Sequence, residues 1–249
     1  MPSPDLRILE RRVYRGANIW SYRPAIRLVV DLGGLEDFPT DKLPGFTEQL
    51  MTLLPNLVEH KCSRGKRGGF VERLEEGTWL GHVSEHVALA LQSLTGADTR
   101  RGKTRSTGDT GRYHVVYDYE DERVGLRAGD LAVRIVNHLV QAEPDFDPVD
   151  AIEEFLRFAK RVGFGPSTRS LVDEARSRGI PWMRLDEKRS LVQLGWGVHQ
   201  RRIQATVTSA TSLIASDIAS DKELCQRLLR DSGVPVPDQR TVTTADDAV

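Results

Sequence analysis

The sequence predicts an α+β protein whose N-terminal domain mixes helices and strands, and three observations carry this prediction. Apolar residues cluster or alternate between glycine and proline signals at 6–16 and 25–34, as they do in strands. Apolar residues recur with helical spacing at 43–57. Tyrosines and valines then alternate at 113–121, which indicates a further strand. Strands and helices are therefore interspersed along the chain.

The rest of the N-terminal domain follows from the same patterns. Its predicted elements after the second strand are helix 43–57, basic loop 62–70, helix 77–92, polar loop 95–111, strand 113–121 and helix 128–142. An amphipathic helix at 142–163 closes the domain, with Asp147 as its cap and Pro148 in its first turn. We place this domain at 1–162.

The pattern changes near Gly163 to a helix followed by short strands, which predicts a second unit. Strands are expected at 181–185, 190–195 and 201–207, and a helix at 216–233 stops at Gly233 before two prolines. We divide this part into segments 163–220 and 221–249. Because one helix and a short tail are too little to close a domain, we expect something larger to begin there.

Charge and composition narrow the classes of partner and compartment. The 249 residues carry 35 Lys and Arg against 36 Asp and Glu, so no overall field favours nucleic acid or a membrane surface as partner. No apolar run reaches the roughly 20 residues needed to cross a bilayer. Cys62 and Cys225 lie far apart in a chain without a leading apolar segment, which favours a cytoplasmic protein over a disulfide framework.

The segment 77–92 contains the pattern H-x-x-E-H, formed by His82, Glu85 and His86. Residues three and four apart share a helix face, so these side chains converge. Two imidazoles at this spacing can hold zinc, and a glutamate between them can act as general base on the zinc-bound water, as in inverzincins. The alternative interpretation is two half-buried histidines, one of them bonded to Glu85. Spacing alone leaves both interpretations open.

A catalytic zinc site needs a third protein ligand. The carboxylates after the strand at 113–121 are nearest in sequence, and we choose Glu122 as the third metal ligand, with Asp118 and Glu120 as alternatives.

Two basic segments are candidate anion-binding surfaces. Their members are Arg64, Arg67, Arg100, Arg101, Lys103 and Arg105. Such side chains grip the carboxylates of a ligand, or they form ordinary solvated loops.

Three stretches taken together resemble the cyanophycin synthetase family: ILERRVYRGANIWS at 8–21, the segment 60–92 and the segment 190–237. The resemblance implies an N-terminal domain that holds the polymer, a pre-ATP-grasp segment at 163–220, and the incomplete start of an ATP-grasp nucleotide-binding domain at 221–249. It also implies remaining ligase domains further along the gene. Homo-oligomer formation stays open, because the family assembles through its larger domains.

The resemblance further implies an ATP-dependent amide ligase that uses ATP and Mg²⁺ to build cyanophycin, a polymer of aspartate with arginine on each side chain. Lys222 matches the lysine that opens the family's ATP site, and its alternative interpretation is an exposed helix lysine. Some family members carry a metal-dependent hydrolytic site that cuts the polymer into primers. His82, Glu85 and His86 match that motif, which favours Zn²⁺ and a hydrolase over the interpretation as two half-buried histidines. A structural interaction domain without either activity is the third hypothesis.

Overall fold

The computed structural model describes residues 5–186, 189–239, 242–244 and 246, and it divides the chain into two compact units. The first unit is Met1–Gly163 and the second is Phe164–Val249. Helices and strands are interspersed in both units, so the α+β prediction is confirmed. Among the described residues, no helix is both long enough and apolar enough to cross a membrane.

The first unit is built on a four-stranded antiparallel sheet in the order β1-β2-β4-β3. Its strands are β1 (Arg7–Tyr14), β2 (Ala25–Asp31), β3 (Gly102–Ser106) and β4 (Arg112–Asp118). Its α-helices are α1 (Phe46–Leu53), α2 (Gly69–Glu76), α3 (Leu80–Ser93), α4 (Glu122–Gln141) and α5 (Pro148–Val162). The short helices η1 (Gly33–Asp37), η2 (Thr40–Lys42), η3 (Pro55–Glu59) and η4 (Cys62–Arg64) fill the connection from β2 to α2.

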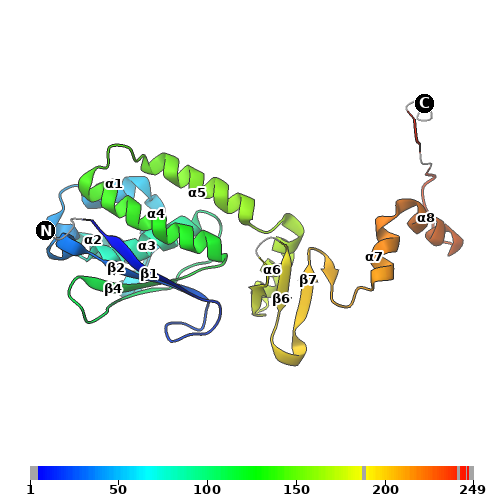
Figure 1. Cartoon of the computed structure of the whole chain (residues 1–249), viewed down its shortest axis with the longest axis horizontal. Coiled ribbons are helices and arrows are strands. Elements are labelled where there is room, and N and C mark those ends of the chain that lie inside the picture. The colour runs from blue at the N-terminus through cyan, green and yellow to red at the C-terminus, as the bar shows by residue number, and fades with distance from the viewer. Residues whose placement is uncertain (1–4, 187–188, 240–241, 245, 247–249) are drawn as a thin grey trace. The chain divides into compact units, whose positions relative to one another are not determined.

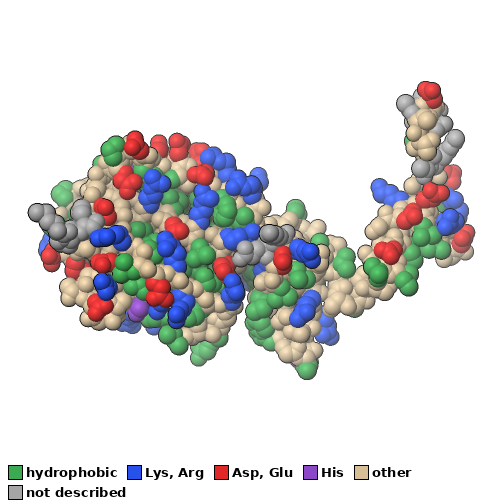
Figure 2. Space-filling model, in the orientation of Figure 1, with side chains coloured by type: hydrophobic (Ala, Val, Ile, Leu, Met, Phe, Trp, Pro, Cys, Tyr) green, Lys and Arg blue, Asp and Glu red, His purple; other side chains and the backbone are tan. Residues whose placement is uncertain are grey.

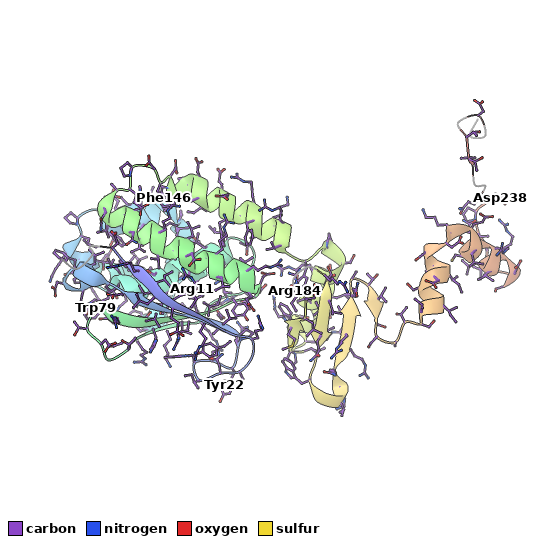
Figure 3. The ribbon with its side chains drawn as sticks, in the orientation of Figure 1. Arg11, Tyr22, Trp79, Phe146, Arg184 and Asp238 are labelled. Atoms are coloured by element: carbon purple, nitrogen blue, oxygen red, sulfur yellow. The ribbon has the colours of Figure 1, made fainter. Side chains whose placement is uncertain are left out.

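The helices cover one face of this sheet (Figure 1). Strand β2 shows the asymmetry, because Ile26, Leu28 and Val30 are fully buried while the alternate residues Arg27 and Val29 are only half-buried. In Figure 3, Tyr22 lies in the loop between β1 and β2, on the side of the sheet away from Phe146, which follows α4. The unit therefore has one covered face and one open face.

Glycines allow α4 to approach the sheet closely. A Cβ atom on Gly129 would collide with the hydroxyl of Tyr117, and one on Gly125 would meet Ile26. The Tyr117 hydroxyl instead donates a 3.0 Å hydrogen bond to the carbonyl of Gly125. The predicted helix at 128–142 begins earlier, at Glu122, because Asp121 caps it by accepting from the backbone N–H groups of the next turn.

Two further sequence predictions, the cap of α5 and the loop at 95–111, have different outcomes. The cap of α5 is confirmed, since Asp147 accepts hydrogen bonds from the N–H groups of Val149 and Asp150 and Pro148 occupies the first turn. The prediction of an unbroken loop at 95–111 is wrong, because this stretch contains strand β3.

The second unit contains a small antiparallel sheet in the order β5-β6-β7-β8. Its elements are α6 (Pro166–Ser177), β5 (Trp182–Arg184), β6 (Leu191–Leu194), η5 (Gly197–His199), β7 (Arg201–Gln204), β8 (Val207–Thr208), α7 (Leu213–Ser220) and α8 (Lys222–Asp231). Its small core is Val172, Val192 and Ile203. The single helix predicted at 216–233 is wrong, because Asp221 ends α7 and caps α8.

Candidate metal centre

Helix α3 carries the H-x-x-E-H residues and is enclosed on nearly all sides. Its residues from Val83 to Gln92 are all buried. Glu85 and His86 are only 4% and 5% exposed, and His82 is half-buried. The three side chains are therefore not solvent-facing, and each polar atom needs a partner within the protein.

The segment before α2 supplies partners for both histidines. The Sγ atom of Cys62 lies 3.4 Å from Nε2 of His82. Nδ1 of His60 lies 2.8 Å from Nδ1 of His86. The His86 ring also stacks on Phe70, with 3.9 Å between ring centroids. The basic composition of 62–70 predicted a loop, and neither Cys62 nor His60 was expected at the site.

Cys62, His82 and His86 form a group that fits a metal ion, with ligand atoms within 4.8 Å of one another. Nδ1 of His82 contacts the Thr78 hydroxyl at 2.9 Å, and Nδ1 of His86 contacts His60. Such second contacts orient metal-ligating imidazoles and leave the Nε2 atoms free for the ion. One thiolate and two imidazoles are a zinc donor set that leaves a fourth position open. The side chains present therefore fit zinc.

The electrostatics of the cluster suit neutral imidazoles and a protonatable carboxyl group. Burial lowers the pKa of both His60 and His82 to about 4. Burial, followed by the charges of the two neighbouring histidines, lowers the pKa of His86 well below its usual value. Burial raises the pKa of Glu85 to about 7. The histidines are therefore in the form that binds metal, and Glu85 can exchange a proton near neutral pH.

Strand β3 holds the Glu85 carboxyl group beside the metal-ligand set. The Thr104 hydroxyl donates a 2.6 Å hydrogen bond to Oε2 of Glu85. Oε1 of Glu85 lies 4.0 Å from Nε2 of His86. Gly102 has no side chain at the point where a Cβ atom would collide with this carboxyl group. Glu85 thus sits between β3 and His86, where it can act on a group bound at the metal position.

The carboxylates chosen as a third ligand lie elsewhere. Glu122, the first residue of α4, forms an ion pair with Arg15 at 2.7 Å. Asp118 pairs with Arg23 at 3.2 Å, and Glu120 accepts the backbone N–H of Asp98. None of them belongs to the group of metal-competent side chains found among the described residues, whose third member is Cys62.

The predicted basic residues divide into two sets. Arg64, Arg67 and Arg100 form ion pairs with Glu76, Glu59 and Asp98 respectively. Arg101, Lys103 and Arg105 are exposed and have no ion pair with any described residue. Over the face of the molecule in Figure 2, acidic and basic side chains are interspersed. Because they have no such ion pair within the described part of the chain, Arg101, Lys103 and Arg105 are the better candidates for binding an anionic ligand.

Lys222 belongs to the second unit. It is the exposed first residue of α8, after the cap Asp221. Both cysteines of the chain, Cys62 and Cys225, are free thiols.

The first unit is thus an α+β domain in which two histidines of the central helix α3 and a cysteine of η4 form a group that could hold a metal ion. Residues 27–141 match the family described as the cyanophycin synthase-like N-terminal domain. Most of the first unit lies within this match, so the resemblance noted in the sequence is confirmed.

Curated relatives extend the similarity over nearly the whole chain. The chain is 45% identical to the cyanophycin synthetase of Crocosphaera subtropica, in an alignment that covers 95% of the chain. It is 44% identical to the cyanophycin synthetase of Synechocystis sp., in an alignment that covers 97% of the chain. It is 41% identical to the cyanophycin synthetase of Geminocystis herdmanii over 97% of its length. The chain spans about 28% of the length of these relatives.

Proposed function

We propose that this chain is the N-terminal portion of a cyanophycin synthetase, an ATP- and Mg²⁺-dependent amide ligase, and that the first unit binds the Asp/Arg polymer. The observation that carries the proposal is the similarity of 41–45% over at least 95% of the chain to curated proteins of that name. Residues 163–220 and 221–249 are then the pre-ATP-grasp segment and the start of the ATP-grasp domain, where Lys222 neutralises nucleotide phosphate. The remaining ligase domains are the expected covalent partners, in the cytoplasm.

Retention of the purified chain on insoluble polymer, without ATP, tests this function. We expect the chain to sediment with the polymer, while an unrelated protein of similar size and near-zero net charge stays in the supernatant. Loss of the chain to the supernatant at low ionic strength would contradict polymer binding.

A second candidate function is zinc-dependent hydrolysis of the polymer backbone, and the Cys62–His82–His86 group favours it. Zinc held by these three side chains would supply Lewis-acid activation of a water molecule. Glu85, whose pKa is raised to about 7, then takes a proton from the attacking water and returns it to the leaving amine nitrogen. The products are two shorter chains, one with a new carboxylate and one with a new amine.

The Glu85→Gln variant separates this function from polymer binding. Because the amide keeps the shape of the side chain but cannot accept the proton, we expect cleavage to cease while zinc and polymer stay bound. The matched control is Glu75→Gln, an exposed position on α2, which should cleave normally. If wild-type protein purified without chelator holds no zinc and releases no shorter chains, the hydrolase function is wrong.

A further inference from the structure

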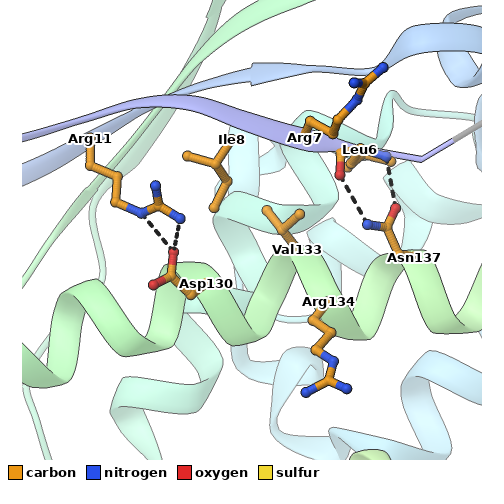
Figure 4. A pocket seen from close by; sticks show the side chains of 8 residues that line it. All are labelled: Leu6, Arg7, Ile8, Arg11, Asp130, Val133, Arg134 and Asn137. Atoms are coloured by element: carbon orange, nitrogen blue, oxygen red, sulfur yellow. Dashed lines mark hydrogen bonds and ion pairs between the residues drawn. The ribbon is translucent and has the colours of Figure 1, made fainter. Parts of the chain in front are cut away.

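The two edge strands of the first unit's sheet, β1 and β3, differ in whether other side chains of the protein bond to their outer edges. At the start of β1, the side chain of Asn137 accepts the N–H of Leu6 at 2.8 Å and donates to its carbonyl at 3.0 Å (Figure 4). Arg11 on the same strand is tied to Asp130 on α4 by an ion pair at 2.7 Å. A shallow groove of about 350 Å³ between β1 and α4 is thus bridged by the protein's own side chains.

No described side chain covers the outer edge of β3 in this way. Backbone hydrogen bonds from Asp118 to Arg101 and from Thr107 to Arg112 lie at the two ends of its ladder with β4. Because hydrogen-bonded pairs alternate in an antiparallel ladder, Lys103 and Arg105 direct their N–H and C=O groups toward β4. The backbone groups of Gly102, Thr104 and Ser106 point away from the sheet, and they form no hydrogen bond with any residue that the structure describes.

Side chains alternate along the same strand. Thr104 faces α3, since its hydroxyl bonds to Glu85, so Gly102 and Ser106 share that side. Arg101, Lys103 and Arg105 point to the open face, about 7 Å from one another, which is the two-residue repeat of an extended chain. The edge therefore offers unpaired main-chain groups together with a row of cations at strand spacing.

We propose that the main chain of the Asp/Arg polymer adds to the outer edge of β3 as a further strand. This inference rests on the proposed function and specifies how the polymer is held. Main-chain hydrogen bonds form with Gly102, Thr104 and Ser106, while carboxylates on every second polymer unit meet Arg101, Lys103 and Arg105. Intervening units lie on the side of Thr104, whose hydroxyl bonds to the buried Glu85.

The positive charge of the β3 edge determines which kind of extended chain can pair with it. Basic side chains on an edge strand oppose pairing with a second copy of β3, because like charges would lie opposite one another. A chain that carries carboxylates at alternate positions meets attraction at the same places. The occupant favoured by this edge is therefore a carboxylate-bearing extended chain and not another copy of this protein.

A matched pair of variants at Ser106 tests the main-chain contacts. Ser106→Pro removes the outward N–H, a change that edge strands tolerate, and Ser106→Ala removes the same hydroxyl but keeps the N–H. The probe is a fluorescent oligomer of ten aspartates, each carrying arginine, titrated with the full 249-residue chain. We expect Ser106→Pro to weaken binding by about fivefold, the share of one hydrogen bond, and Ser106→Ala to bind like wild type.

Charge-reversal variants test the ionic contacts, and amide hydrogen exchange tests the main-chain contacts. Lys103→Glu with Arg105→Glu should weaken oligomer binding by more than about tenfold, whereas Arg64→Glu with Arg67→Glu, which alter arginines already paired, should change it less than about twofold. Saturating oligomer should slow amide hydrogen exchange at Gly102, Thr104 and Ser106.

The outcomes separate this inference from the function beneath it. If wild type binds the oligomer but Ser106→Pro binds equally well and the three amides exchange at unchanged rates, strand addition is wrong while polymer binding stands. If wild type binds neither the oligomer nor the insoluble polymer, the proposed function fails and strand addition fails with it.

Discussion

The thiol of Cys62 lies 3.4 Å from Nε2 of His82, although twenty residues separate them along the chain. This contact brings a third donor to the pair of histidines on α3. Ligand atoms around a tetrahedral zinc ion are roughly 3.5 Å apart, so the observed spread of up to 4.8 Å needs only a small contraction. A thiol and two neutral imidazoles are therefore close to the arrangement that zinc requires.

Replacing Cys62 should weaken zinc binding without unfolding the protein. We expect Cys62→Ser to lower zinc affinity by at least about tenfold, because a hydroxyl is a much poorer zinc ligand than a thiolate. Competition with a chromophoric chelator measures the affinity. Cys225→Ser, in the second unit, is the control and should bind zinc like wild type. Equal affinity in both variants would remove Cys62 from the site.

Acid should destabilise the metal-free protein between about pH 6.5 and pH 4. The pKa of His60 and His82 falls from 6.5 when unfolded to about 4 when folded, so unfolding takes up protons in this window and the free energy of unfolding falls as pH falls. His86 acts in the same direction. Glu85 opposes them, since its pKa is about 7 when folded and the unfolded side chain releases that proton.

The net effect is measurable by urea unfolding with EDTA present. Three histidines against one glutamate give a net uptake of nearly two protons on unfolding near pH 5.5, which at about 1.4 kcal/mol per proton is a slope of roughly 2.5 kcal/mol per pH unit. His60→Gln should reduce this slope by about 1.4 kcal/mol per pH unit, which is the contribution of one proton. A free energy of unfolding that stays constant from pH 7 to pH 5 would contradict the burial of neutral histidines.

Adding one methyl group at Gly102 should disturb the Glu85 carboxyl group. A Cβ atom there collides with the carboxyl group and with the Cγ atom of Glu85, so Gly102→Ala must displace that side chain. We expect a loss of about 1–3 kcal/mol of stability, with polymer cleavage strongly reduced. Gly16→Ala meets no atom within 4 Å and serves as control. Chemical denaturation and a cleavage assay together check the prediction, and a stable, active Gly102→Ala protein would refute it.

The cap of α5 offers a test of the fold away from the site. Asp147→Ala removes the acceptor of the Val149 and Asp150 N–H groups, and we expect a loss of about 1 kcal/mol. Asp145→Ala, an exposed aspartate two residues earlier, should be close to neutral. Thermal unfolding of both variants measures the difference, and equal stabilities would show that the cap contributes nothing.

Sequence patterns predicted the strands whose side chains alternate between core and surface, but they missed β3. Lys103 and Arg105 face the open side and Thr104 is only half-buried, so the strand has no apolar signal. Its place is fixed by main-chain hydrogen bonds to β4, which leave no trace in the composition of the segment.

The same limit applies to the metal ligands. Helical spacing correctly brought His82, Glu85 and His86 to one region, because that spacing is local. The third donor depends on how the segment before α2 folds against α3, and the nearby His60 and Cys62, two residues apart, were the available signal. Glu122 was chosen for its nearness in sequence, but its carboxylate is engaged by Arg15.

Zinc-edge X-ray absorption on the purified chain, with zinc content determined in parallel, tests the central claim most directly. The account predicts one zinc per chain, coordinated by one sulfur and two imidazole nitrogens, with the sulfur signal lost in Cys62→Ser. A chain that binds no zinc, or zinc whose coordination is unchanged in Cys62→Ser and His82→Ala, would contradict it.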